Sequence, residues 1–130
     1  MNDIRIPISP GELLDKITIL QIKAERIDDA AKVANVKTEL EMLSKVWNET
    51  VEADDEISAL SAELKSINEA LWEIEDDIRD EERNKRFGDR FIELARAVYV
   101  TNDERANAKK KVNLHLNSTI VEEKSYQDYK

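Results

Sequence analysis

The chain contains no cysteine, and its 130 residues include only two glycines and two prolines. Without cysteine, disulfide bonds, thiolate metal sites and thiol nucleophiles are all excluded. Two glycines are too few for a phosphate-cradling loop. No apolar run approaches the ~20 residues that a membrane-spanning helix needs, and the first residues do not resemble a signal peptide. We therefore expect a cytoplasmic protein with no membrane partner.

The residues that are abundant favour long helices. Charged residues make up 38% of the chain and hydrophobic residues 41%, with many Glu, Lys, Leu, Ile and Ala. This composition is typical of helical proteins, and it contains too much Ile, Leu and Val for a disordered chain. The net charge of −9 argues against nucleic acid as a partner, because phosphate backbones repel acidic proteins.

Charge is distributed unevenly along the chain. Residues 1–38 carry six acidic and six basic side chains, residues 39–82 carry sixteen and three, and residues 83–130 carry seven and eleven. The opposite charges predict that the acidic middle packs near the basic end, within one chain or across a dimer. The alternative is a dedicated acidic site for metal ions or for a basic partner.

Two helices are predicted in the first half of the chain. Ser9 and Glu12 form a capping box around Pro10, and the apolar residues that follow predict a helix over about 10–28. A second stripe, shifted in phase, predicts a helix over about 31–51: Val33, Val36, Leu40, Leu43 and Trp47.

The most regular stripe predicts a helix over about 55–84. Its apolar residues are spaced three and four apart, as in a coiled-coil seam: Ile57, Leu60, Leu64, Ile67, Leu71, Ile74 and Ile78. Between residues 31 and 84 the pattern fits either two helices or one long helix with a phase shift. We favour a turn near 52–55, because Asp54 or Asp55 can cap a new helix.

The last part of the chain predicts a helical hairpin. Gly88 marks a break before a short helix over about 90–99, and Thr101 and Glu104 form a second capping box that predicts another helix. The predicted fold is an all-α single domain over 1–130, an antiparallel bundle of three longer helices plus this C-terminal hairpin. Because a long seam often finds its partner in a second chain, we expect a homodimer.

Carboxylates on two predicted helices are candidate metal ligands. Glu69, Glu73 and Asp76 share one face of the third helix, and Glu12 and Asp15 are spaced three apart on the first. Mg²⁺ and Mn²⁺ prefer such oxygen ligands. The alternative is an ordinary solvated helix face.

One pattern of these carboxylates resembles the all-α nucleotide pyrophosphatases. Those enzymes hold Mg²⁺ with Glu-x-x-Glu and Glu-x-x-Asp pairs on bundle helices. Glu73 to Asp76 and Glu12 to Asp15 fit the second pattern, but no clear Glu-x-x-Glu pair lies on the preceding helix.

A polar group around the junction of the later helices predicts either a buried network or a pocket for a small anion. Its members are Asn68, Arg79, Arg96, Tyr99, Asn102 and Arg105. The single histidine, His115, has no cysteine partner and is interpreted as a surface residue.

Four blocks of the sequence are similar to an uncharacterised family of small all-helical proteins from bacteria and marine phages. They are SPGELLDKITIL at 9–20, NEALWEIEDDIR at 68–79, FIELAR at 91–96 and EEKSY at 122–126. The resemblance implies an all-helical fold and no particular activity.

Two functions are compatible with the sequence. The first is a non-enzymatic helical interaction or assembly module without a cofactor, homodimeric or bound to another protein. The second is a Mg²⁺- or Mn²⁺-dependent enzyme acting on a nucleotide or phosphorylated substrate, in which Arg79 or Arg96 would hold the phosphate.

Overall fold

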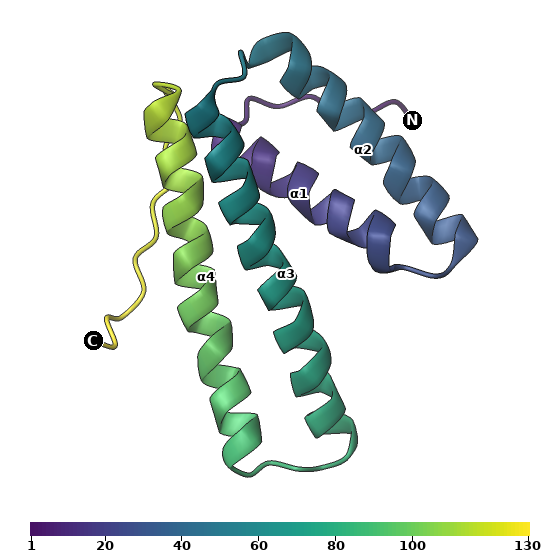
Figure 1. The fold of residues 1–130 in the computed structure, drawn as a ribbon, viewed down its shortest axis with the longest axis vertical. Coiled ribbons are helices and arrows are strands. Elements are labelled where there is room, and N and C mark those ends of the chain that lie inside the picture. The colour runs from purple at the N-terminus through teal and green to yellow at the C-terminus, as the bar shows by residue number, and fades with distance from the viewer.

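The computed structural model describes all of residues 1–130 as four α-helices without any strand. The helices are α1 (Pro10–Arg26), α2 (Ala30–Thr50), α3 (Asp55–Arg83) and α4 (Asp89–His115). The two longest, α3 and α4, run antiparallel, and α1 and α2 form a second hairpin that leans away from them (Figure 1). The predicted all-α class is confirmed.

Short polar side chains begin three of the helices. Ser9 Oγ accepts a hydrogen bond from the Glu12 amide at 3.1 Å, Asp29 caps α2 in the same way, and Asp54 caps α3 through the Ile57 amide at 2.7 Å. Each of these bonds satisfies an amide that the first turn of a helix leaves free. The turn near 52–55 is therefore confirmed, and residues 31–84 form two helices.

The predicted C-terminal helical hairpin is wrong, because α4 is one continuous helix from Asp89 to His115. Thr101 and Glu104 lie inside this helix and cap nothing. No glycine or proline follows Gly88, so nothing in the backbone forces a break there. Apolar residues on both sides of the predicted break, Leu94 and Ala108, are buried. Continuous packing along α4 therefore outweighs the local capping signal.

The core lies where α1, α3 and α4 meet. Its six buried members are Leu14, Ile57, Leu60, Leu64, Ala108 and Val112, with Trp47 packed against them. The predicted seam of α3 contributes three of these residues, and α3 makes its most extensive contacts with α4 of the same chain. The first half of the α3 seam is therefore buried within one chain, whereas its later residues are half-buried: Ile67, Leu71, Ile74 and Ile78.

Ion pairs join the acidic α3 to the basic end of the chain, as the charge distribution predicts. Lys111 lies 3.5 Å from Glu63, and Arg90 lies 3.5 Å from Asp77. Exposed pairs of this kind contribute about 0–1 kcal/mol each, so they orient the helices more than they stabilise them.

None of the four helices combines the length and the apolar character that crossing a bilayer requires.

Truncation of Leu64 tests the position of the core. Leu64 is fully buried, so Leu64→Ala leaves a cavity and is expected to lower the free energy of unfolding by about 2–5 kcal/mol. The matched control is Leu114→Ala on α4, because Leu114 is 60% exposed and should cost less than about 0.5 kcal/mol. Urea denaturation followed by circular dichroism measures both. Equal losses for the two variants would contradict this core.

Candidate functional site

The first turn of α1 lies in close contact with α4. The Gly11 amide donates a hydrogen bond to Asn113 Oδ1 at 2.7 Å. A Cβ atom at residue 11 would lie 2.4 Å from the backbone carbonyl oxygen of Lys109, which is closer than such atoms can approach. Glycine at this position therefore permits the approach of α1 that places the next turn, with Glu12 and Asp15, against α4.

Asp15 is a buried carboxylate held by three helices. Its side chain is 1% exposed, and its Oδ1 accepts hydrogen bonds from Asn68 Nδ2 of α3 and Arg105 Nε of α4, each at 2.9 Å. Arg105 Nη2 bonds the other oxygen, so the pair is bidentate. Asn68 also donates to Thr18 Oγ1 at 3.1 Å. A buried carboxylate with this many donors is stabilised in its charged form.

The surroundings of Asp15 lower its pKa. Burial raises the pKa of this carboxyl, but hydrogen bonds from Arg105 and Asn68 and the charges of Arg105 and Lys109 together outweigh burial. Asp15 in turn raises the pKa of Arg105. Both groups are therefore charged at neutral pH, and Asp15 holds the Arg105 guanidinium in a fixed orientation.

A second polar contact ties the end of the chain to the start of α1. Glu122 accepts hydrogen bonds from Ser9 Oγ at 2.5 Å and from Asn113 Nδ2 at 3.1 Å. Burial alone would raise the pKa of Glu122. The pKa is nevertheless lowered, because hydrogen bonds that include those from Ser9 and Asn113 favour the charged carboxylate. Residues 118–130, which we name the C-terminal tail, form no strand and lie along α4 (Figure 1).

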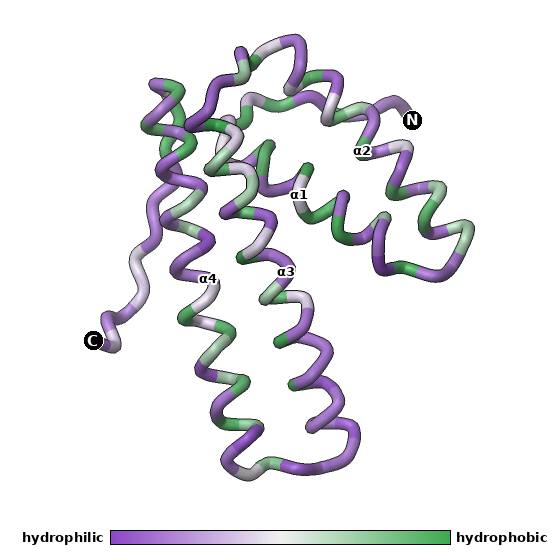
Figure 2. Tube along the Cα trace, viewed as in Figure 1, coloured by the Kyte–Doolittle hydropathy of each residue, from purple (hydrophilic) through white to green (hydrophobic).

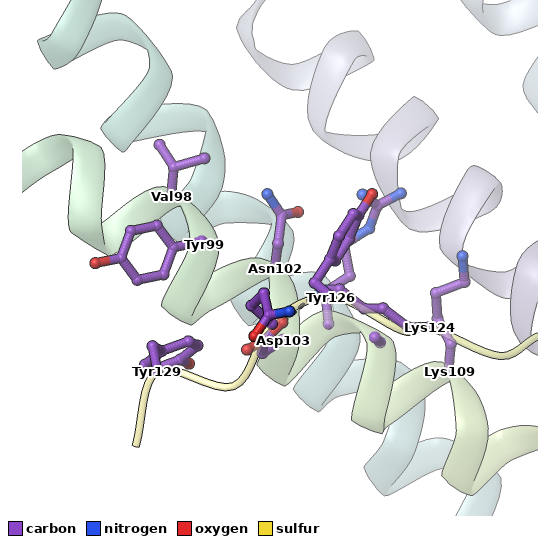
Figure 3. A pocket seen from close by; sticks show the side chains of 11 residues that line it. Val98, Tyr99, Asn102, Asp103, Lys109, Lys124, Tyr126 and Tyr129 are labelled. Atoms are coloured by element: carbon purple, nitrogen blue, oxygen red, sulfur yellow. Dashed lines mark hydrogen bonds and ion pairs between the residues drawn. The ribbon is translucent and has the colours of Figure 1, made fainter.

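A cleft lies between α4 and the C-terminal tail, and we name it the tail cleft. Its volume is about 790 Å³, within the range of small-molecule sites. In Figure 3, Tyr99 and Tyr129 lie together at one end, and Asn102 lies between Tyr99 and Tyr126 in this view. Arg105 and Lys109 of α4 and Lys124 of the tail also line the cleft.

Three of the six residues predicted as an anion pocket line this cleft. They are Tyr99, Asn102 and Arg105. Asn68 lies behind the cleft, bonded to Asp15. Arg79 pairs with Glu75 of its own helix and Arg96 does not pair with an acidic side chain, and neither arginine lines the cleft. The predicted group is thus divided between a pocket, the buried network and the rest of the surface.

The five predicted metal ligands do not converge. Glu12 pairs with Lys109, Asp15 with Arg105, and both Glu69 and Glu73 with Arg26 of α1. Asp76 is exposed. The structure contains no group of three or more acidic or histidine side chains that could hold a metal ion. Metal binding by these residues stays a prediction without geometric support.

Several residues of the site were not predicted from the sequence. Lys109 lies four residues after Arg105 on the same face of α4, and this spacing could have revealed it. No spacing in the sequence marks the other residues of the site, which are Asn113, Glu122, Lys124 and Tyr126. Three of them fall in the block at 122–126, which resembles a family but shows no chemistry by itself.

Removal of the Asp15 charge tests the buried network. Asp15→Asn is expected to lower the free energy of unfolding at pH 7 by about 1–3 kcal/mol, because Arg105 loses its charged acceptor. The pKa of Asp15 is lower in the folded state than its ordinary value of 3.8, so the charged carboxylate stabilises the fold fully at pH values well above 3.8. This stabilisation is lost as the pH falls below 3.8 and through the folded-state pKa. Denaturation of both proteins from pH 7 to 2.5 should show the difference shrinking.

The control for this series is Asp76→Asn, an identical change at an exposed residue without an ion pair. It should leave the free energy of unfolding nearly unchanged at every pH. A loss at Asp15 that keeps the same size from pH 7 to 2.5 would show that the charge is not its cause.

Substitution of Gly11 tests the contact between α1 and α4. Gly11→Ala is expected to cost about 1–3 kcal/mol, because the Lys109 carbonyl belongs to the backbone of a helix and cannot move aside cheaply. Gly88→Ala is the matched control, since a Cβ atom at residue 88 would meet nothing within 4 Å, and it should change stability by less than about 1 kcal/mol. Thermal melts of both variants measure this contrast, and equal melting temperatures would contradict the close approach.

Comparison with known proteins identifies the family but no activity. No curated protein and no solved structure matches the chain. A family model described as a family of unknown function does match, and it covers nearly the whole chain, as the resemblance of the four blocks predicts. The chain therefore belongs to the family of unknown function DUF6165, whose model matches residues 4–129.

Proposed function

We propose that the protein is a non-enzymatic helical interaction module that assembles as a homodimer through α2. The observation that carries this proposal is the lack of any buried residue in α2, although this helix has 21 residues. Its apolar stripe against α1 is only half-buried, and apart from Trp47, which packs against the core, α2 lies against α1 alone. A helix covered this poorly gains stability when a second surface packs on it.

The side of α2 that faces away from α1 is uncharged over most of its length. On a helical wheel, one exposed arc holds Ala31, Ala34, Asn35, Thr38, Met42 and Val46. In the last turns of α2 the same arc also holds Lys45 and Glu49, which pair with each other. Met42 and Val46 are each 49% exposed and supply the largest apolar surface of this arc. Figure 2 shows hydrophobic positions at intervals along α2, in contrast to the largely hydrophilic later turns of α3.

Charge selects α2 over α3 as the surface for a second copy. The bases Lys32, Lys37 and Lys45 of α2 balance its three glutamates, so two copies of this helix do not repel each other. Helix α3 carries eleven acidic and three basic side chains, a net charge of −8, and two such faces would oppose association. The homodimer is therefore assigned to α2, because the first half of the α3 seam is buried within the chain and its half-buried second half lies on the strongly acidic helix.

The arrangement of titratable groups supports a role without catalysis. His115 Nε2 lies 2.8 Å from Asp54, where it ties the end of α4 to the cap of α3. Asp15, Glu12, Arg105 and Lys109 pair with one another. These groups stabilise contacts between helices. No observation favours the alternative metal-dependent enzyme, which needs converging carboxylates.

The oligomeric state in solution tests the proposal. Sedimentation equilibrium at about 10–100 µM is expected to give twice the chain mass of 15.0 kDa. The double variant Met42→Glu and Val46→Glu places like charges on the shared face and should give the monomer mass. Ile92→Glu is the matched control, because Ile92 is 53% exposed on α4, and it should remain dimeric. A native chain that is monomeric at 100 µM would refute the dimer.

A further inference from the structure

The tail cleft has free hydrogen-bonding groups held in fixed positions. Arg105 donates to Asp15 through Nε and Nη2, which leaves Nη1 without a protein acceptor. No buried side-chain nitrogen or oxygen lacks a partner in this structure, so Nη1 is accessible. Because Arg105 lines the cleft, this nitrogen can donate to a ligand there. The buried Asp15 carboxylate fixes the guanidinium before any ligand arrives.

Asn102 extends the polar side of the cleft. It lies three residues before Arg105 on α4, so the two side chains share one face of the helix. Its amide makes no hydrogen bond to the protein and lines the cleft. An arginine N–H and a free amide on one face are a suitable pair of donors for a carboxylate.

Tyrosines supply the apolar side of the cleft. Tyr126 of the tail is 83% exposed, and Lys124 Nζ lies 5.3 Å from the centroid of its ring. Tyr99 packs edge-to-face on Tyr129 with ring centroids 5.1 Å apart, which closes one end of the cleft. Exposed tyrosine rings beside fixed donors offer stacking surfaces for a flat apolar group.

The charges around the cleft limit the charge of its ligand. Each cation that lines it already has a carboxylate partner: Arg105 pairs with Asp15, Lys109 with Glu12, and Lys124 with Asp103. The three pairs sum to zero, so the lining has no unpaired cation that could offset a second negative charge on a ligand. A single negative charge can still bond the free Arg105 nitrogen.

We infer that the tail cleft binds a small monocarboxylate that carries an apolar ring. The carboxylate accepts hydrogen bonds from Arg105 Nη1 and Asn102, and the ring packs on Tyr126. The tail forms the outer wall of the site, because Glu122 anchors it to Ser9 and Lys124 anchors it to Asp103. This site lies on the side of α4 away from α2, so it does not depend on the proposed dimer (Figure 1).

Benzoate, which combines one carboxylate with one ring, is the probe for this inference. Titration of the full-length, ¹⁵N-labelled chain is expected to shift the side-chain resonances of Asn102 and Arg105 saturably, with a dissociation constant of about 1 mM. Benzamide has nearly the same shape without the charge and should bind roughly tenfold more weakly. Inorganic phosphate should shift the same resonances less than benzoate does.

Substitutions of cleft residues then assign the site. Asn102→Ala and Tyr126→Ala are each expected to weaken benzoate binding by roughly fivefold or more, because each removes a direct contact. Arg96→Ala is the matched control, since Arg96 is an arginine of α4 outside the cleft, and benzoate binding should be unchanged. Three results would overturn the inference: no saturable shift up to about 20 mM benzoate, equal binding of benzamide, or stronger shifts with phosphate.

Discussion

The structure depends on one buried charge pair, Asp15 with Arg105. The carboxylate lies at the junction of α1, α3 and α4, and its donors come from the last two of these helices. Because an unpaired buried carboxylate is costly, this pair fixes how far α1 can rotate or slide against the other helices. The apolar core around Leu64 supplies most of the stabilisation, and apolar contacts alone specify register less sharply.

The same pair connects the core to the tail cleft. One edge of the Arg105 guanidinium faces Asp15 and the other is accessible, so a buried structural interaction positions a group at the surface. Gly11 contributes by letting α1 approach the Lys109 backbone, and Asn113 and Glu122 join that turn to the tail. Residues from both ends of the chain therefore shape a single region.

Much of this fold could be predicted from the sequence, because its signals are local. Ser9, Asp29 and Asp54 are short polar residues directly before amphipathic stretches, and each caps a helix. The wrong prediction of a helix start at Thr101 also came from a local signal. A capping box is a local pattern, and packing of α4 against α3 decided the outcome there.

The site was predicted less well, because it is made of contacts between distant residues. The helical periodicity places Asp15 near the apolar stripe of α1 but does not show that Arg105 lies opposite. All six residues were grouped because they lie around the junction of the predicted later helices. Tyr99, Asn102 and Arg105 do line one cleft, because α4 is continuous and carries all three, whereas Arg79 and Arg96 do not line it. The tail residues have no periodicity at all, so their place against α4 could not be derived.

The hydrogen bond between Ser9 and Glu122 joins residues 113 positions apart, and this separation has a consequence for synthesis on the ribosome. The α1–α2 hairpin emerges first, yet the partners of Asp15 follow 53 and 90 positions later. Until α4 has been made, the nascent hairpin has no counterion from that helix for the Asp15 carboxylate and lacks much of the cover for its apolar surface. We therefore expect the N-terminal half to remain loosely packed during translation and to pack fully only after α4 and the C-terminal tail have left the ribosome.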